Sequence, residues 1–509
     1  MGTDAATPGH MSPDEFRRQG HATIDAIADY WQALQSPGAP PVLSRARPGD
    51  VLAALPARAP EHPEPFDDVL ADIARVVMPG LTHWQHPSFF AYFPSNGSGP
   101  AVLGDLLSTG LGIQGMLWAT SPACTELETR VTDWMAHALG LPRSFIAEPD
   151  ASSVSPGGGV IQGTASESTL VAMLAARHRL RRSDTRAVPV VYCSHQAHSS
   201  VVKAAMIAGI TEEDGTARVR QIATLPDWSI DAGALREQMR RDLASGLRPA
   251  MVCATLGTTG VMAFDDLAAV AGAIETAGSP HPVWLHADAA MGGAAFICPE
   301  LRGPLAGADR LDSLCFNPHK WLLTSFDCGL FWTRDSEALT GALSVTPEYL
   351  RNAASNAGAV TDYRDWQVPL GRRFRSLKLW CVLRHYGLEG LRTHVRNHLK
   401  LAEWLESQVH ASDRFELAAP RPACSPLVCL RLRGDASTPE LAGALNGRAR
   451  SLLEGLNASG SAYFSHTTLP DTERPGNPPV YIIRVSIGGT FTARPHVEQA
   501  WRLLCDTPV

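Results

Sequence analysis

Short apolar segments alternate with segments of helical periodicity through the middle of this chain. The length and apolar character of these short segments are typical of buried strands. Strands that alternate with helices usually form a mostly parallel sheet that helices cover on both faces. We therefore expect an α/β fold over about residues 155–335. The expected strands are residues 188–193, 251–256, 283–286, 313–316 and 329–332.

The N-terminal part of the chain follows other patterns. Residues 12–35 carry apolar residues at helical spacing after a Ser-Pro pair, so we expect a helix there. Residues 36–65 are rich in proline and alanine, and we expect an extended arm that lies on another surface, such as that of a partner subunit. A second helix is expected to begin at Ser121-Pro122, where a capping side chain precedes a proline.

After about residue 378 the pattern changes again. A helix is expected over residues 395–409, followed by strands over residues 427–432 and 481–487, which indicates a smaller α+β domain. We therefore expect a helical and extended dimerisation segment, a large sheet-containing domain and a small C-terminal domain. Their expected limits are residues 1–98, 99–377 and 378–509.

Composition narrows the class of protein. The chain has 509 residues, of which 45% are hydrophobic and 19% charged, so we expect a globular protein with more than one domain. Its 44 basic and 51 acidic residues give a net charge of −7, which argues against nucleic-acid binding. The ten cysteines lack metal-type spacing, and no apolar run approaches a membrane span. We expect a cytoplasmic protein with no metal site and no membrane partner.

The most informative residue is a lysine inside an apolar region. Lys320 lies in the sequence Asn-Pro-His-Lys-Trp at residues 317–321, between the apolar segments 313–316 and 328–332. A surface lysine at a strand end is the ordinary interpretation of such a residue. However, Asp288 ends another apolar segment, and a pyridoxal phosphate (PLP) site requires an amine paired with a carboxylate. We therefore predict that Lys320 binds PLP and that Asp288 pairs with its ring nitrogen.

A glycine-rich stretch supplies a candidate phosphate site. Residues 157–159 are all glycine, and Thr164, Ala165 and Ser166 follow at the start of a helical pattern. Glycines and small hydroxyl residues at a helix start expose backbone N–H groups to an anion. A plain turn is the alternative interpretation. Because a PLP site is already predicted, we favour a phosphate cradle at Thr164, Ala165 and Ser166.

Two histidines follow the apolar segment that ends at residue 193. His195 and His198 have a spacing compatible with metal binding, but no further ligands cluster nearby in the sequence. His198 is open to two interpretations, a cap on the following helix or an imidazole that stacks on the pyridine ring of PLP. We prefer the second.

Ordered motifs run along most of the chain, at residues 86–94, 118–128, 157–167, 196–200, 256–259, 286–290, 317–323 and 361–377. In this order they resemble the PLP-dependent group II amino acid decarboxylases, specifically the aromatic-L-amino-acid decarboxylases. The likeness extends from about residue 12 to about residue 505. It implies a fold-type I, transferase-like PLP enzyme and an intertwined, obligate homodimer.

The family's motif positions transfer to this chain residue by residue. They imply that Lys320 holds the PLP aldehyde, that Asp288 pairs with the ring nitrogen and that His198 stacks on the ring. Tyr349 matches a catalytic tyrosine that donates the proton after decarboxylation. The other implied cofactor-binding residues are Thr164, Ala165, Ser166, Thr259, Ala290, Asn317 and His319. The implied substrate pocket contains Trp84, Tyr92, Phe93 and Pro94.

Three further pocket positions bear on substrate choice. Gln114 and Met116 stand where the family's animal members carry isoleucine and phenylalanine, at positions expected to reach the partner's pocket. Gly371 stands where some relatives that prefer phenols or histidine carry serine. Glycine and methionine leave room for a bicyclic indole. We therefore expect tryptophan or 5-hydroxytryptophan to be accepted at least as well as tyrosine, although Gln114 could instead hydrogen-bond a phenol.

The resemblance implies a carboxy-lyase that converts an aromatic L-amino acid to the arylethylamine and carbon dioxide. The candidate substrates are tryptophan, 5-hydroxytryptophan, dopa, tyrosine and phenylalanine. One alternative is an aromatic aldehyde synthase, which adds oxidative deamination, but relatives with that activity lack the tyrosine that Tyr349 matches. The other is a non-catalytic homologue, which the presence of both Lys320 and Asp288 disfavours.

Overall fold

A seven-stranded sheet forms the centre of the large domain, within the residues that the computed structural model describes (10–147, 157–345 and 360–508). The strands follow one another across the sheet in the order β2-β8-β7-β6-β5-β3-β4. Their bounds are β2 Gly158–Gln162, β3 Pro189–Ser194, β4 Val219–Ile222, β5 Arg248–Thr255, β6 Trp284–Asp288, β7 Ser313–Phe316 and β8 Gly329–Thr333.

Most neighbouring strands in this sheet are parallel. β4, β3, β5, β6 and β7 run parallel to one another, whereas β8 is antiparallel to both β7 and β2. The expected α/β class with a mostly parallel sheet is therefore confirmed. The segments predicted as strands overlap β3, β5, β6, β7 and β8. The apolar pattern does not predict β2, which begins with glycines, or β4, which is a short and half-buried edge strand.

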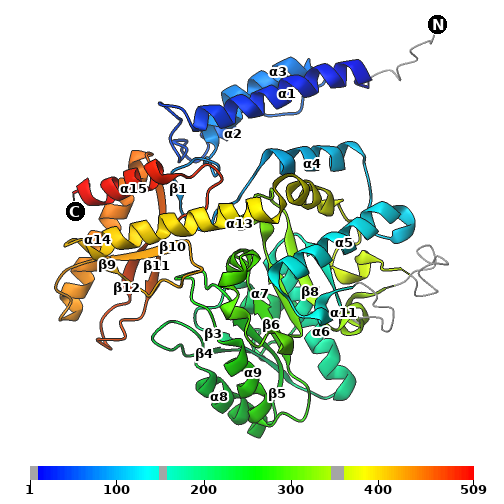
Figure 1. The fold of residues 1–509 in the computed structure, drawn as a ribbon, viewed down its shortest axis with the longest axis vertical. Coiled ribbons are helices and arrows are strands. Elements are labelled where there is room, and N and C mark those ends of the chain that lie inside the picture. The colour runs from blue at the N-terminus through cyan, green and yellow to red at the C-terminus, as the bar shows by residue number, and fades with distance from the viewer. Residues whose placement is uncertain (1–9, 148–156, 346–359, 509) are drawn as a thin grey trace.

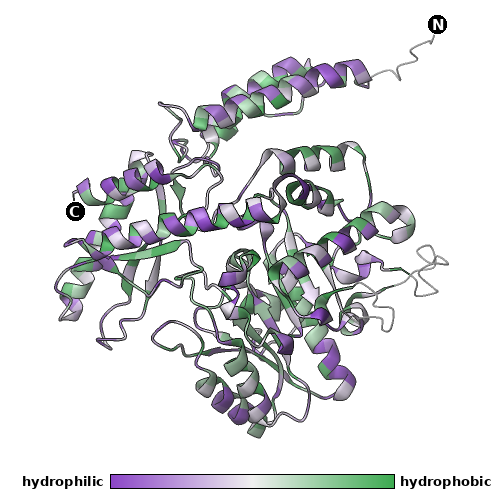
Figure 2. Ribbon diagram, in the orientation of Figure 1, coloured by the Kyte–Doolittle hydropathy of each residue, from purple (hydrophilic) through white to green (hydrophobic). Residues whose placement is uncertain are grey.

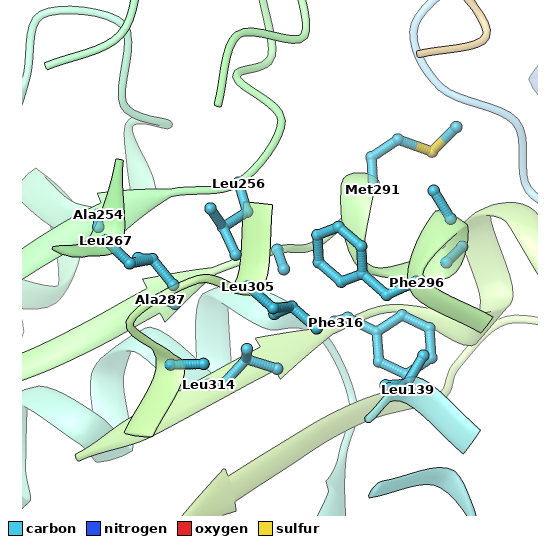
Figure 3. Packing of buried hydrophobic residues seen from close by; sticks show 14 of the residues in the cluster. Leu139, Ala254, Leu256, Leu267, Ala287, Met291, Phe296, Leu305, Leu314 and Phe316 are labelled. Carbon is cyan, nitrogen blue, oxygen red and sulfur yellow. The ribbon is translucent and has the colours of Figure 1, made fainter. Parts of the chain in front are cut away.

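Helices cover both faces of the sheet (Figure 1). Side chains of α6, α7 and α11 enter the apolar cluster on one face, and side chains of α5, α8 and α9 enter the cluster on the other. Because side chains alternate along a strand, Leu314 and Phe316 of β7 face one cluster and Cys315 faces the other. Figure 3 shows Leu314 and Phe316 in the cluster that also contains Phe296. The helices are α4 Gly99–Gly110, α5 Pro122–Leu139, α6 Ala165–Ser183, α7 Ser200–Ile207, α8 Ala232–Ala244, α9 Leu267–Ala277 and α11 Ser336–Leu343.

The N-terminal helices lie apart from the large sheet (Figure 1). α1 spans Pro13–Leu34, and the side chain of Ser12 accepts the backbone N–H of Glu15, which confirms the helix predicted there. Two shorter helices follow, α2 (Asp50–Ala54) and α3 (Phe66–Asp72). The start predicted for α5 is also confirmed, because Ser121 caps that helix by accepting the N–H of Cys124.

The C-terminal part forms a second, smaller unit around a five-stranded sheet in the order β1-β11-β12-β10-β9. The helix α13 (Arg375–His410) runs from the large domain into this unit, and it turns at Gly387, where φ is +62° (Figure 1). The sequence pattern predicts only the second half of this helix. The remaining helices are α14 Pro439–Ser459 and α15 Arg494–Asp506. The strands are β1 Phe89–Phe90, β9 Phe415–Leu417, β10 Leu427–Leu432, β11 Tyr463–Leu469 and β12 Val480–Ser486.

The strand β1 belongs to the segment expected to be the N-terminal dimerisation unit, yet it pairs in parallel with β11 of the small domain. This pairing brings residues just after β1 to the border between the two domains. None of the helices described in the structure combines the length and apolar character that crossing a lipid bilayer requires.

Candidate active site

The carboxyl ends of the central parallel strands meet at one edge of the large sheet. β5 ends at Thr255, β6 ends at Asp288, and the short helix α10 (Pro318–Trp321) follows β7 and carries Lys320. Ligands of parallel sheets bind at this edge. A cavity of about 210 Å³ lies there. It is lined by the predicted cofactor residues Thr164, Ala165, Ser166, His198, Thr259, Asp288, Ala290, Asn317, His319 and Lys320.

Lys320 occupies an environment that disfavours its charge. Its Nζ lies 5.4 Å from the centroid of the Phe93 ring. Burial lowers the pKa of Lys320, the carboxylate of Asp288 opposes this shift, and the nearby guanidinium of Arg484 adds to it. A lowered pKa makes the neutral amine, which is the nucleophilic form, more accessible near neutral pH.

Asp288 is a buried carboxylate at the same edge, with 5% of its surface exposed. Its Oδ1 accepts the backbone N–H of Ala290 at 3.0 Å and lies 3.9 Å from the thiol sulfur of Cys315. Asp288 also lines the cavity, so its carboxylate is available to a ligand there. Lys320 and Asp288 therefore line one cavity, as the sequence predicts.

The N-terminus of α6 forms one wall of the cavity. Thr164 is the capping residue, in an extended conformation, and Ala165 and Ser166 begin the first turn. The backbone N–H groups of a first helical turn have no partner within the helix, so they suit an anion. Asn317 Oδ1 and Thr255 Oγ1 are buried without a hydrogen-bond partner among the described residues. The cavity lining thus combines the positive end of α6 with buried polar side chains that have no partner among the described residues.

The glycines that precede the phosphate candidates lie in a strand of the large sheet. Gly158 and Gly159 lie within β2, away from the residues that line the cavity. A Cβ on Gly159 would stand 2.6 Å from the Trp332 indole nitrogen and 2.7 Å from Thr132, so glycine is required for close packing. These two glycines therefore do not line the cavity, whereas the predicted phosphate candidates Thr164, Ala165 and Ser166 do.

Both interpretations of His198 find support in its position. Its Nδ1 accepts the backbone N–H of Ser200, the first residue of α7, and its ring lines the cavity. Burial lowers the pKa of His198, Asp288 opposes that shift and Lys320 adds to it. His319 accepts the N–H of Cys328 at 2.9 Å, and burial lowers the pKa of His319 to about 4. Both imidazoles in the cavity lining are therefore expected to be neutral near pH 7.

A second, larger cavity of about 1100 Å³ adjoins the first. Both cavities are lined by Phe93, His198 and Lys320, so they meet at the lysine. The larger cavity is also lined by Trp84, Tyr92 and Pro94, as predicted for a substrate pocket. The rings of Trp84 and Tyr92 are stacked with their centroids 5.8 Å apart. The pocket wall near Lys320 is therefore strongly aromatic.

The small domain supplies pocket residues that the sequence analysis did not identify. Tyr463 of β11 places its hydroxyl 3.1 Å from that of Tyr92. Arg484 of β12 is only 3% exposed and donates to Gly260 O at 2.9 Å and to Ser465 Oγ at 2.7 Å. Both Tyr463 and Arg484 line the larger cavity. An arginine within an otherwise apolar strand is the signal that could have identified Arg484, because charged residues are rarely buried without a reason.

Three residues predicted to contact the substrate lie outside the linings of both cavities. The residues that line the two cavities do not include Gln114, Met116 or Gly371 among those described. Gln114 Oε1 accepts the backbone N–H of Arg372 at 2.6 Å, and its amide lies 3.5 Å from where a Cβ of Gly371 would be. The expectation that Gln114 and Met116 reach a partner's pocket stays a prediction. Tyr349 lies outside the described residues.

Comparisons with known proteins find similar sequences along nearly the whole chain. The conserved domain of the pyridoxal-dependent decarboxylases matches residues 48–433. The chain is 44% identical to a phenylacetaldehyde synthase of Arabidopsis thaliana over 97% of this chain and 96% of that protein. It is also 44% identical to tyrosine decarboxylase 2 of Narcissus pseudonarcissus, over 97% of this chain and 94% of that one.

Solved structures extend the likeness to the fold. The structure of Oryza sativa TDC with PLP and tryptamine superposes with a TM-score of 0.88 at 39% identity, covering 97% of this chain and 98% of that one. The expected fold-type I class and the PLP cofactor are therefore confirmed. Because the matching domain covers most of the chain and the relatives span nearly all of it, this chain belongs to the family of pyridoxal-dependent decarboxylases.

Proposed function

We propose that this chain is a cytoplasmic, homodimeric enzyme that decarboxylates aromatic L-amino acids to arylethylamines and carbon dioxide. The observation that carries the proposal is the meeting of two cavities at Lys320. The smaller holds Asp288 and the N-terminus of α6, and the larger has an aromatic wall. A cofactor in the first cavity and an aromatic substrate in the second would share that lysine.

The residues of the smaller cavity fit PLP. The first turn of α6 and the Thr255 hydroxyl offer donors to a phosphate, and a flip of the buried Asn317 amide would offer another. Asp288 offers a carboxylate to the ring nitrogen, and His198 offers an imidazole to the ring face. When bound, PLP supplies an aldehyde for covalent attachment and a ring that accepts the electron pair released as the carboxylate leaves.

Three side chains of this protein would then have separate chemical roles. Lys320, with its lowered pKa, provides the neutral amine that attaches the cofactor and later returns to release the product. Asp288 holds a proton at the ring nitrogen, which keeps the ring an effective electron acceptor. Tyr349, outside the described residues, is the proposed donor of the proton that replaces the carboxylate at the substrate carbon.

The aromatic wall supports the substrate class. Trp84, Tyr92, Phe93 and Tyr463 offer ring faces and edges to an aromatic side chain. Arg484 brings a positive charge to the same cavity, where it would attract the substrate carboxylate. The cavity volume also accommodates an indole, in keeping with our expectation that tryptophan is accepted at least as well as tyrosine.

Apolar side chains on the N-terminal helices support a homodimer. Phe16 and Ile24 of α1, Val69 of α3, and Leu103 and Leu107 of α4 are all exposed. Figure 2 shows the corresponding green segments, which are longest on α4. Exposed apolar patches of this kind mark protein interfaces. The ten cysteines are all free, which is usual in the reducing cytoplasm.

A second candidate function is aromatic aldehyde synthesis. It is favoured by the 44% identity to a phenylacetaldehyde synthase. The presence of Tyr349 argues for simple decarboxylation, because a proton donor at the substrate carbon would compete with oxygen.

The test is a panel of aromatic and non-aromatic L-amino acids with the purified, PLP-loaded protein. Amine, aldehyde, carbon dioxide and hydrogen peroxide are quantified separately. We expect equal amounts of amine and carbon dioxide from at least one aromatic substrate, and no peroxide. Aldehyde with peroxide would support the second candidate, and turnover confined to non-aromatic amino acids would overturn the proposed substrate class.

A further inference from the structure

A row of buried polar side chains runs along β6 and β7 to the carboxylate of Asp288. Trp284, His286 and Asp288 alternate along β6 and therefore share one face of the sheet with Ser313 and Cys315 of β7. His286 is paired in register with Ser313, and Asp288 with Cys315. Trp284, His286, Ser313 and Cys315 are fully buried. Polar groups buried so deeply must satisfy one another.

The donor fixes the direction of the first hydrogen bond in the row. The Trp284 indole, which can only donate, donates to Ser313 Oγ at 2.7 Å. The hydroxyl proton of Ser313 is then free to be donated to His286 Nδ1, 2.8 Å away. Burial lowers the pKa of His286 to about 4, so the ring is neutral. A neutral ring that accepts this proton at Nδ1 carries its own single proton on Nε2. That nitrogen lies 3.7 Å from Cys315 Sγ.

Cys315 stands between the histidine and the carboxylate. Burial, reinforced by the charge of Asp288, raises the pKa of Cys315 well above its ordinary value, so the sulfur keeps its proton. With His286 donating to the sulfur, the thiol proton is directed to Asp288 Oδ1 at 3.9 Å. Oδ1 also accepts the Ala290 N–H. The bonds that the described residues give to Asp288 therefore both fall on Oδ1, which leaves Oδ2 for the cofactor.

We infer that Cys315 is a positioning residue, which fixes the rotation of the Asp288 carboxylate through a thiol hydrogen bond backed by His286, Ser313 and Trp284. The inference rests on the role that the proposed function gives to Asp288. The carboxylate has only one other described donor, the Ala290 N–H, so loss of the thiol frees its rotation. A carboxylate that rotates meets the ring nitrogen less often, and both cofactor affinity and turnover fall.

The experiment compares three cysteine variants. Cys315→Ala removes the donor, and Cys315→Ser replaces it with a hydroxyl donor. Cys253→Ala is the matched control, because Cys253 of β5 is also fully buried and faces the same apolar cluster. Each apoprotein is titrated with PLP, and the visible circular dichroism of the bound cofactor, kcat and KM are recorded. Far-UV circular dichroism checks the fold.

We expect Cys315→Ala to weaken PLP binding roughly three- to tenfold, the range set by losing one weak hydrogen bond to a carboxylate. The visible circular dichroism band should change shape and kcat should fall by a similar factor, while KM changes by less than about twofold. Cys315→Ser should recover most of this loss, and Cys253→Ala should match the parent. A Cys315→Ala variant no more impaired than Cys253→Ala, or a Cys315→Ser variant as impaired as Cys315→Ala, would overturn the inference.

The Asp288→Asn background separates this inference from the proposed function. If Cys315 acts through Asp288, adding Cys315→Ala to Asp288→Asn should change PLP affinity by less than about twofold further. An additive effect shows that Cys315 acts by another route and overturns the inference alone. If Asp288→Asn itself binds PLP and turns over like the parent, the role of Asp288 fails, and with it the basis of both proposals.

Discussion

The amine of Lys320 lies 5.4 Å from the centroid of the Phe93 ring. The guanidinium carbon of Arg484 lies 5.2 Å from the same centroid, so one aromatic ring is shared by two cations. Each cation gains from the ring but repels the other, and burial adds to the cost of charging the lysine. The pKa of Lys320 falls first through burial and further through the charge of Arg484, and the attraction of the ring does not offset these two effects. The small domain thus acts directly on the reactive amine.

Lys320→Ala should abolish amine formation and leave the fold intact. The variant loses covalent attachment of the cofactor, which supplies many decades of rate. We expect the absorbance of the lysine-bound cofactor to disappear while far-UV circular dichroism stays that of the parent. Lys203→Ala is a suitable control, because Lys203 is an exposed lysine on α7. Amine production near that of the parent would contradict the role of Lys320.

Arg484→Lys should weaken substrate binding although it keeps the charge. A lysine cannot donate to both Gly260 O and Ser465 Oγ as the arginine fork does. Without these bonds the positive charge is no longer held in place, so its contact with the substrate carboxylate weakens. A hydrogen bond to a charged group contributes about 1.5–3 kcal/mol, so we expect KM to rise by roughly tenfold or more. Arg431→Lys, on the neighbouring strand β10 and partly exposed, is the control. An unchanged KM in Arg484→Lys would show that the guanidinium does not shape the substrate pocket.

Tyr349→Phe should divert the reaction from amine toward aldehyde. Without the hydroxyl, the substrate carbon waits longer for its proton, and oxygen can oxidise it. The products would then be aldehyde, ammonia and hydrogen peroxide, measured against total carbon dioxide. Tyr386→Phe, a tyrosine of α13 remote from both cavity linings, serves as control. If the amine yield is unchanged and no peroxide forms, another group delivers the proton.

The sequence predicts the positions of Lys320 and Asp288 at one cavity because single residues carry the signal. A lysine between two apolar segments and an aspartate at the end of another are conspicuous, and the parallel sheet brings them to one edge. Ser121 likewise indicates the start of α5, because serine is a common helix cap and a proline follows it. Such features can be recognised from neighbouring residues in the sequence, without knowledge of the tertiary structure.

The parts that the sequence does not predict depend on packing between distant elements. The glycines of β2 serve contacts with Trp332 and Thr132, and nothing nearby in the chain reveals these neighbours. Tyr463 and Arg484 reach the pocket only because α13 and β1 place the small-domain sheet beside it. Gln114 looks free to bind a phenol, but its side-chain oxygen is taken by the Arg372 N–H. Contacts between residues that are distant in the sequence therefore determine the roles that the sequence pattern does not predict.

Buried histidines make the stability of the fold sensitive to acid. His398 accepts the indole N–H of Trp321, the residue after Lys320, at 2.9 Å. It is 3% exposed, and burial lowers the pKa of His398 to about 4. Above the ordinary value of 6.5 the histidine is neutral in both the folded and unfolded states, so it costs nothing. As the pH falls from 6.5 toward 4, only the unfolded chain takes up the proton, and the folded state loses stability.

His398→Gln should therefore flatten the pH dependence of stability. Glutamine can still accept the Trp321 N–H through its amide oxygen but has no proton to gain. Between pH 7.5 and pH 5, we expect the free energy of unfolding of the parent to fall by about 2 kcal/mol more than that of the variant. Urea titrations at several pH values measure this difference. His410→Gln, at an exposed histidine at the end of α13, should leave the parent's slope unchanged. Parallel curves for the parent and His398→Gln would mean that His398 takes up its proton as readily in the folded protein as in the unfolded chain.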